Sequence, residues 1–376
     1  MPGCESMNPR LIAFYLPQYH PIPENDAWWG KGFTEWTNVA KAKPLFRGHY
    51  QPHLPADLGF YDLRVPEVRE QQAKLASEAG IEGFCYWHYW FAGKQLLERP
   101  FNEVLASGKP DFPFCLAWAN ETWTGKWHGA PDRVLIEQTY PGEEDYKAHF
   151  LDVLPAFLDK RYLCVASKPI FVIYNLKPIE EINQFIRCWR GLAKEHNLPG
   201  IYFIGMGFPE FNYDNLDMDG IINNCFFSTL NKLKRKQLSF IEEVTQNLRG
   251  KIPYRIYSRF SRYPRIFDYE EYINAGFENL QTTKVQFPLI YPNWDNTPRS
   301  GHNGVVLHGS SPELFASQVA LAIDKVRSQE EEKQIVFIKS WNEWAEGNYL
   351  EPDQRFGLAY LEAIRNLLSK NQGINS

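Results

Sequence analysis

The 376-residue sequence has little net charge, no paired cysteine motif and no long apolar run. Its 40 Lys and Arg residues against 45 Asp and Glu give a net charge of −5, so it offers no basic field for nucleic acid. The six cysteines are scattered without a CxxC pair, which favours free thiols over a disulfide framework or a zinc site. No apolar stretch reaches the roughly 18 residues of a membrane span. We therefore expect neither a nucleic-acid partner nor a membrane span.

The chain also lacks signals for targeting and for division into parts. Its opening residues, MPGCESMNPR, contain no apolar signal core, which predicts a cytoplasmic protein, or a periplasmic or surface protein if a signal has been removed. There is no linker, repeat or low-complexity tract, so we expect one catalytic domain over residues 1–376 with long loops. The irregular region 208–284 could contain an insertion. The sequence does not indicate an oligomeric state.

Short strand-like runs alternate with segments of helical periodicity. The eight runs are 11–16, 81–87, 112–118, 169–175, 201–207, 220–224, 287–292 and 335–341. Apolar residues recur every three or four positions in 65–80, 143–160, 179–197 and 311–329, the last with Ser311 as a predicted N-cap and Pro312 in the first turn. This alternation predicts a parallel sheet, and eight strands predict an α/β fold of the (β/α)8 TIM-like barrel type. A doubly wound open sheet is the alternative.

Aromatic residues are abundant, at 15% of the chain with 12 Trp, and many of them follow the strand-like runs together with polar residues. In parallel barrels the functional residues lie at these carboxyl ends. The candidates for substrate binding are Tyr19, His20, Glu35, Trp36, His88, Tyr89, Asn120, Glu121, Trp123, Trp294, Asp295, Arg299, Asn342, Trp344 and Glu351. Sugars present apolar faces that pack on rings and hydroxyls that need polar partners, so this set predicts a carbohydrate pocket. For the two histidines we expect hydroxyl binding and no metal ligation.

The stretch WNEWAEGNYLEP at 341–352 places Glu343 and Glu346 directly after the last apolar run. Residues three apart point to opposite faces of a strand but can converge in a turn, and Gly347 favours a turn here. Two carboxylates that face one cleft are the usual equipment for cleaving a glycosidic bond. Burial beside Trp341 and Trp344 would raise the pKa of whichever carboxyl group has fewer hydrogen bonds and keep it protonated as the acid.

Four motifs in the sequence resemble a known family. FYLPQYHPIPENDAWWGKGFTEW, WANETW, WDNT and SWNEWAEGNYLEP are similar to the WbsX-type proteins, which are often described as glycosyltransferases of lipopolysaccharide biosynthesis. Those proteins are in turn similar to glycoside hydrolase family 99, the endo-α-mannosidase family. The resemblance extends from Leu11 to the last motif.

The resemblance implies a (β/α)8 barrel with two catalytic carboxylates in the last motif. Glu343 would match the residue that deprotonates the 2-hydroxyl of the sugar, so that a 1,2-anhydro sugar forms. Glu346 would match the general acid, which then acts as a base, and the net outcome would be retention. That route suits α-mannosides, because it needs a 2-hydroxyl trans to the leaving group. On a substrate without this geometry, Glu343 could be a direct nucleophile or base.

Three functions remain open at this point. We favour a glycoside hydrolase that acts on an oligo- or polysaccharide, with no cofactor and no metal. The alternative is a glycosyltransferase in lipopolysaccharide or O-antigen biosynthesis, which would usually need a diphosphate site or an acidic metal motif. The only DxD is Asp217–Asp219, a pattern that arises easily by chance. A non-catalytic carbohydrate-binding protein would keep the aromatic residues but would not need paired acids.

Overall fold

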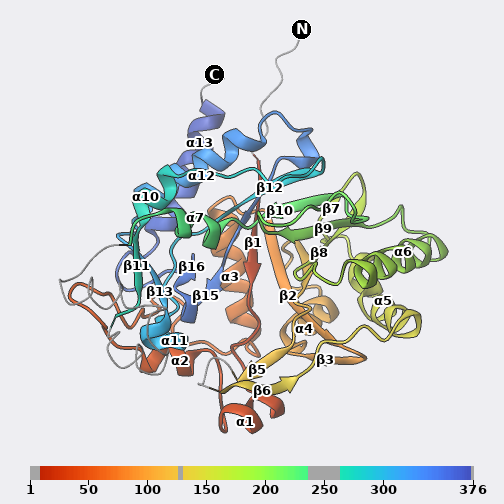
Figure 1. The fold of residues 1–376 in the computed structure, drawn as a ribbon, viewed down its shortest axis with the longest axis horizontal. Helices are drawn as coiled ribbons and strands as arrows, with labels where there is room; N and C mark the ends of the chain where they lie inside the picture. The colour runs from red at the N-terminus through yellow and green to blue at the C-terminus, as the bar shows by residue number, and fades with distance from the viewer. Residues whose placement is uncertain (1–8, 126–129, 236–262, 374–376) are drawn as a thin grey trace.

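The computed structural model describes residues 9–125, 130–235 and 263–373, and its centre is a closed barrel of parallel strands (Figure 1). β1 pairs with both β14 and β2, which closes the sheet. The barrel strands are β1 (Arg10–Tyr15), β2 (Gly83–Phe91), β4 (Phe114–Trp118), β8 (Lys168–Ile173), β9 (Tyr202–Gly207), β10 (Gly220–Asn223), β12 (Val285–Ile290) and β14 (Ile335–Ile338). The predicted barrel is confirmed, and each predicted run coincides with one of these strands.

Helices cover the outside of the barrel (Figure 1). They are α3 (Pro66–Glu78), α4 (Arg99–Ser107), α5 (Glu143–Phe157), α6 (Ile179–Glu195), α7 (Phe226–Lys232), α10 (Tyr269–Asn274), α12 (Pro312–Val326) and α13 (Ala359–Gly373). The predicted cap of α12 is present, since the Ser311 hydroxyl accepts a hydrogen bond of 3.3 Å from the Leu314 N–H.

Because helices lie outside and side chains fill the interior, the barrel strands are buried on both faces. This explains why they appear in the sequence as continuous apolar runs without a polar alternation. All nine residues of β2 are buried, and in β1 Phe14 stacks on Trp87 with 4.7 Å between ring centroids. Each such large apolar side chain stabilises the fold by about 1.5–3 kcal/mol through burial.

Short elements extend the loops around the barrel. Towards the carboxyl ends of the strands, in the lower half of Figure 1, lie α1, α2, α11 and the β5–β6 hairpin, whereas α12 and α13 lie at the opposite end. These additional elements are α1 (Pro23–Trp29), α2 (Trp36–Lys41), α11 (Thr297–Ser300), β3 (Lys94–Leu96), β5 (Trp123–Gly125), β6 (Ala130–Ile136), β7 (Cys164–Val165), β11 (Arg265–Asp268), β13 (Val305–His308), β15 (Asn342–Glu343) and β16 (Asn348–Tyr349). The long loops therefore gather at the end where function was predicted.

Three further sequence predictions concern the region 208–284, the cysteines and membrane spans. The region 208–284 contains β10, α7, β11 and α10, but its residues 236–262 lie outside the described part, so the predicted insertion stays a prediction. Within the described ranges, five cysteines are present and all are free thiols. A search of the described helices finds none that is long and apolar enough to cross a membrane.

Candidate active site

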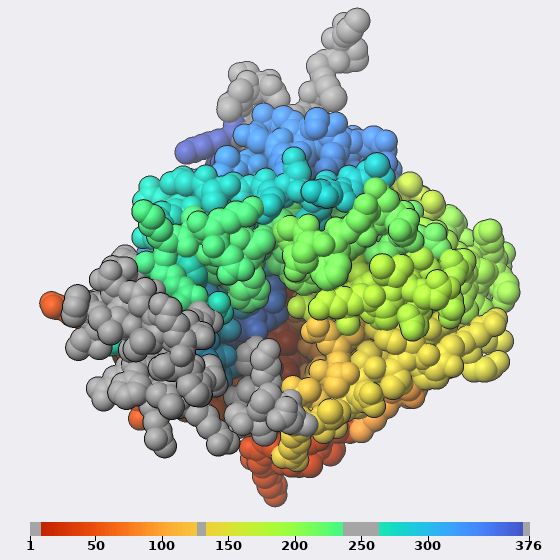
Figure 2. Space-filling view, viewed as in Figure 1, coloured from red at the N-terminus to blue at the C-terminus, as the bar shows by residue number. Residues whose placement is uncertain are grey.

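A cavity of about 630 Å³ opens at the carboxyl ends of the barrel strands. Figure 2 shows a recess near the centre of one face, with atoms from the N-terminal and C-terminal parts of the chain at its bottom. The aromatic lining consists of Trp29, Phe33, Trp87, Tyr89, Trp123 and Tyr174, and the polar lining includes Gln18, Glu35, Asn38, Glu121, Asn175, Arg299, Lys339 and Glu343. Rings interleaved with carboxylates, amides and cations suit a saccharide.

The last motif is fixed beside this cavity by hydrogen bonds to the first loop. The Asn342 side chain accepts from the Leu16 N–H at 2.7 Å and donates to the Leu16 carbonyl at 3.0 Å, so it acts as a clamp between β1 and β15. Beyond it, the chain turns at Gly347, whose φ of +66° is unfavourable for other residues. A Cβ there would lie only 2.7 Å from the backbone nitrogen of Asp295. The predicted turn is present, and it brings Glu343 and Glu346 together.

Glu343 is a buried carboxyl group with mostly neutral partners. Its Oε1 accepts hydrogen bonds from the Trp87 indole at 3.0 Å and from the Ser340 hydroxyl at 3.3 Å, and Lys339 Nζ lies 3.9 Å away. Burial raises the pKa of Glu343 to about 7, although the charge of Lys339 opposes this shift. At neutral pH this group therefore retains a proton for a large part of the time.

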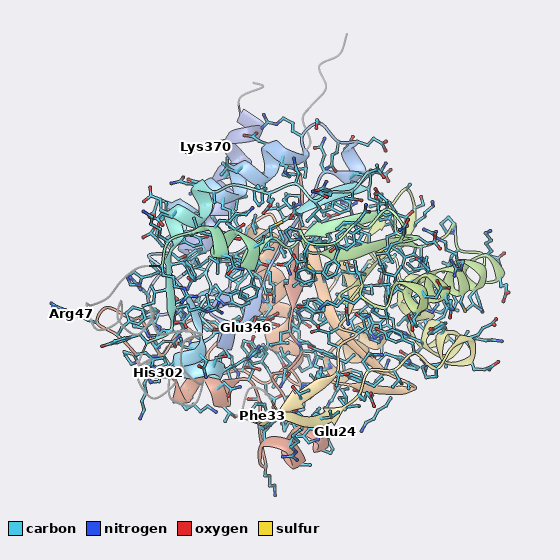
Figure 3. The ribbon with its side chains drawn as sticks, viewed as in Figure 1. Glu24, Phe33, Arg47, His302, Glu346 and Lys370 are labelled. Carbon is cyan, nitrogen blue, oxygen red and sulfur yellow. The ribbon has the colours of Figure 1, made fainter. Side chains whose placement is uncertain are left out.

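Glu346, in contrast, is held between two cations. Arg299 Nη1 lies 2.6 Å from its Oε1, and Lys339 Nζ lies 3.4 Å from its Oε2. Burial raises the pKa of Glu346, but Lys339 and Arg299 outweigh it and hold the pKa at about 2. Figure 3 labels Glu346 near the centre of the view, and its side chain is 7% exposed. This carboxylate is therefore an anion over the whole physiological range.

The two carboxyl groups also act on each other, because Glu346 raises the pKa of Glu343 and Glu343 lowers the pKa of Glu346, so they titrate as a pair. A further carboxylate joins the network, because Arg299 Nε bonds Glu35 at 2.9 Å and Glu35 accepts from Asn38 at 3.1 Å. Three carboxyl groups from two separate loops thus surround two cations.

Most of the predicted site residues fall into two groups in the structure. Those that line the cavity are Glu35, Tyr89, Glu121, Trp123, Arg299 and Glu343. Others lie behind it and support it by packing or hydrogen bonds, namely Tyr19, Trp36, Asn120, Asn342, Trp344 and Glu351. Glu351, for example, accepts hydrogen bonds from Trp344 at 2.6 Å and Gln72 at 2.6 Å. Burial raises its pKa to about 7.

His88 and His20 do not line the cavity. His88 lies on the opposite face of β2 from Tyr89, and its Nε2 contacts His149 Nε2 at 2.8 Å. Burial lowers the pKa of His88 to about 4, so the pair is neutral at physiological pH. The Nδ1 of His20 contacts the Pro17 carbonyl at 3.0 Å, and its pKa is also lowered by burial. Both rings are packed into the protein, and their positions do not provide the expected contact with sugar hydroxyls.

Trp294 and Asp295 do not line the cavity either. The Trp294 ring lies under the Lys339 ammonium group, with 5.2 Å from Nζ to the ring centroid. Asp295 pairs with His49 at 2.6 Å and accepts from Gln51 at 2.7 Å, and it lines a separate cavity of about 190 Å³. Neither residue therefore lines the main cavity: Trp294 packs against Lys339, and Asp295 lines the separate cavity.

Among the residues that line the cavity but were not selected from the sequence are Trp87, Tyr174 and Lys339. The sequence position of each of these residues indicated that it could line the cavity. Trp87 is two residues before Tyr89, so the period of two along a strand places both on the same face. Lys339 and Tyr174 each directly follow a barrel strand, which is the position from which this fold takes its functional residues.

The DxD pair lies away from this site. Asp217 pairs with Arg187 at 3.2 Å, and Asp219 pairs with Arg190 at 3.1 Å. Both acids precede β10 and so lie at the amino end of the barrel, opposite the cavity. Over residues 9–125, 130–235 and 263–373, no group of three or more His, Cys, Asp or Glu residues could hold a metal ion.

Solved structures with the same fold are glycoside hydrolases or similar to them. A "glycoside hydrolase-like protein" aligns with a TM-score of 0.57 and 14% identity over 97% of this chain and 95% of its own. The GH99 endo-alpha-mannosidase from Bacteroides thetaiotaomicron aligns with a TM-score of 0.56 and 14% identity over 97% of this chain and 98% of its own. At this identity the likeness establishes the fold.

Comparisons of the sequence with known proteins identify the family. A curated relative from Xanthomonas campestris pv. campestris (strain B100), "uncharacterized protein WxcX", is 38% identical over 369 residues, which cover 97% of this chain and 50% of that protein. This chain thus spans about half the length of the curated relatives that it matches. The family model described as "Glycosyltransferase WbsX" matches residues 11–364. The chain therefore belongs to the WbsX family, and its barrel has the same fold as the GH99 endo-alpha-mannosidase.

Proposed function

We propose that this chain is a glycoside hydrolase that cleaves a glycosidic bond in an oligo- or polysaccharide. The observation that carries the proposal is the pair of Glu343 and Glu346, whose environments favour opposite charge states beside an aromatic cavity. One protonated and one ionised carboxyl group are what general-acid cleavage of a glycoside requires.

The spacing of the pair supports retention of configuration. An inverting enzyme keeps its carboxyl groups roughly 6.5–9.5 Å apart to make room for a water molecule, whereas a retaining enzyme keeps them about 5 Å apart. Glu343 and Glu346 are near enough for each to shift the pKa of the other, which favours the shorter separation. We therefore infer a retaining reaction.

The charges around the cavity favour an uncharged sugar. Arg299 and Lys339 are the cations that line its described wall, and each is already paired with carboxylates. A uronic acid or phosphate would have to displace Glu35 or Glu346 from them. An α-mannoside is the sugar that we propose, because its 2-hydroxyl geometry agrees with the family resemblance and because the GH99 neighbour is an endo-alpha-mannosidase.

A glycosyltransferase is the second candidate, because the family model carries that name. A nucleotide-sugar donor brings a diphosphate that needs free positive charge or a bound metal. The paired state of Arg299 and Lys339, and the position of the DxD at the other end of the barrel, both speak against such a site. We therefore rank it below the hydrolase.

The test is a product assay on α-mannans and bacterial polysaccharides without nucleotide sugar. Wild type is compared with Glu346→Gln and with Glu180→Gln, a control at an exposed position on α6. We expect oligosaccharide release by wild type and the control, and a loss of at least about 100-fold in the Glu346 variant. Turnover that appears only after addition of a nucleotide sugar would favour the transferase instead.

A further inference from the structure

A second cavity, of about 190 Å³, adjoins the candidate active site and has no part in the proposed reaction. Gly347, which follows Glu346 in the turn, forms part of its wall, and the Asp295 N–H donates a hydrogen bond of 2.7 Å to the Glu346 carbonyl. The described linings of the two cavities have no residue in common. The second cavity is therefore a separate space beside the catalytic turn.

The size of the second cavity suits one small polar molecule. A water molecule takes up about 30 Å³ in the liquid, so the 190 Å³ equal the volume of about six waters, which is room for one sugar ring. The main cavity, at about 630 Å³, has room for several rings.

Aromatic rings stand at the mouth of the second cavity. Tyr50, Phe356 and Tyr360 line it and are each partly exposed, so the cavity opens to solvent on their side. The Phe356 and Tyr360 rings meet edge to face, with 5.4 Å between their centroids. Such rings offer the apolar surface on which the C–H face of a sugar packs.

The lining also holds polar atoms with capacity for further hydrogen bonds. The buried Oδ1 of Asn293 has no hydrogen-bond partner within the described part of the chain. The Ser310 hydroxyl donates to the Pro292 carbonyl at 2.6 Å, so in its 2.6 Å contact with Tyr360 it accepts, and the Tyr360 oxygen can accept another hydrogen bond. The exposed Arg355 guanidinium lies over the Phe356 ring at 4.9 Å and supplies N–H donors.

The charges in the lining are of both signs, which favours an uncharged ligand. Asp295 pairs with His49 at 2.6 Å, and Asp353 accepts from the Tyr349 hydroxyl at 2.7 Å and from two backbone N–H groups. An anion in the cavity would approach these two acids, whereas a cation would approach Arg355. A neutral molecule with several hydroxyl groups meets neither repulsion.

We propose that the second cavity binds one uncharged sugar residue, distinct from the residues that occupy the main cavity. Phe356 and Tyr360 form its apolar wall, and Asn293, Tyr360 and Arg355 bind its hydroxyls. The polypeptide thus has a saccharide site beside the catalytic turn as well as in the main cavity. This inference concerns binding alone and does not depend on the proposed hydrolase function.

Histidine resonances test the proposal, because His308 lines the second cavity and no histidine lines the described wall of the main one. Imidazole ¹³C resonances of histidine-labelled protein, with that of His308 assigned by His308→Gln, are followed while methyl glycosides are added. The compounds are methyl α-D-mannopyranoside, methyl α-D-glucopyranoside, methyl β-D-galactopyranoside and methyl α-L-rhamnopyranoside. We expect at least one of them to shift the His308 resonance in a saturable way.

Variants then locate the bound sugar. Arg355→Gln should weaken its binding about tenfold through loss of charged donors, and Phe356→Ala about three- to tenfold through loss of a ring. Arg365→Gln, at an exposed position on α13, is the control for Arg355 and should change nothing. Trp123→Ala, in the wall of the main cavity, should also leave the His308 shift unchanged.

Three results would overturn the proposal. The first is that none of the four glycosides shifts His308. The second is that inorganic phosphate shifts it as strongly as the sugar, which would indicate an anion site. The third is that Trp123→Ala abolishes binding while Arg355→Gln does not, which would place the sugar in the main cavity. Wild type that binds the sugar here but cleaves no polysaccharide would refute the hydrolase and leave this site in place.

Discussion

Substitution of Lys339 by Met should move the pH dependence of activity upwards. Lys339 Nζ lies 3.9 Å from Glu343 and 3.4 Å from Glu346, in a partly buried position over the Trp294 ring. Its charge favours the ionised form of both carboxyl groups, and therefore lowers the pKa at which the pair gives up its proton.

The size of this effect follows from Coulomb's law. Over the 3.9 Å to Glu343, an effective dielectric constant of about 20 gives about 4 kcal/mol, or about 3 pKa units. Arg299 remains in the variant and water will enter the vacated space, so we expect a shift of about 1–3 units. Because the acid works in its protonated form, activity falls as pH rises through its pKa. The alkaline limb of kcat/KM should therefore move from about 7 to between about 8 and 10.

The assay is the pH profile of kcat/KM on the saccharide that wild type cleaves, supported by a ¹³C NMR titration of the glutamate carboxyl groups. Lys339→Arg keeps the charge and should leave the limb within about half a unit of wild type. Lys325→Met, on α12 and away from the cavity, controls for the loss of a partly buried lysine. An alkaline limb that stays near 7 in Lys339→Met, or that moves down, would refute the charge network described here.

Three further predictions concern the support of the site. Asn342→Ala should destabilise the protein by about 2–5 kcal/mol in urea unfolding, because the buried N–H and C=O of Leu16 both lose their partner; a loss under about 1 kcal/mol would contradict the clamp. Gly347→Ala should cost about 2 kcal/mol or more by the same assay, since its Cβ meets a backbone nitrogen at 2.7 Å. Gly309→Ala is the control, because Gly309 also has a positive φ but leaves open space around an added Cβ. It should cost less stability than Gly347→Ala, and equal losses of stability would exclude the steric effect. Trp123→Ala should raise KM about tenfold with little change in kcat, as expected for a wall of the cavity, whereas a loss confined to kcat would place it in the chemistry.

Much of the fold was available from the sequence because strands buried on both faces form continuous apolar runs. Even the short run at 220–224 corresponds to β10. The capped start of α12 at Ser311 was readable from local chemistry alone. The turn at Gly347 was readable for the same reason, since its conformation is one that only glycine adopts easily.

Some predicted site residues do not line the cavity, and one reason is their position along a strand. His88 and Tyr89 were both selected, although neighbouring residues on a strand point to opposite faces. Tyr89 lines the cavity, and His88 packs against His149 on the other side. Similarly, Asp295 follows β12 as a functional residue would, but its pairing with His49 depends on a loop almost 250 residues earlier in the chain. No local pattern predicts such a contact.

The charge state of the acid pair was the least predictable feature, because it is set by groups from separate loops. Arg299 follows β12, Lys339 follows β14 and Glu35 follows β1, and only the closed barrel brings them together. The motif that contains Glu343 and Glu346 therefore fixes the geometry of the pair but not its protonation. Without Arg299 and Lys339, two buried and adjacent carboxyl groups would both favour the protonated form, and the pair would lose the opposite charge states that general-acid cleavage requires. The catalytic unit that we propose is thus the pair together with its two cations.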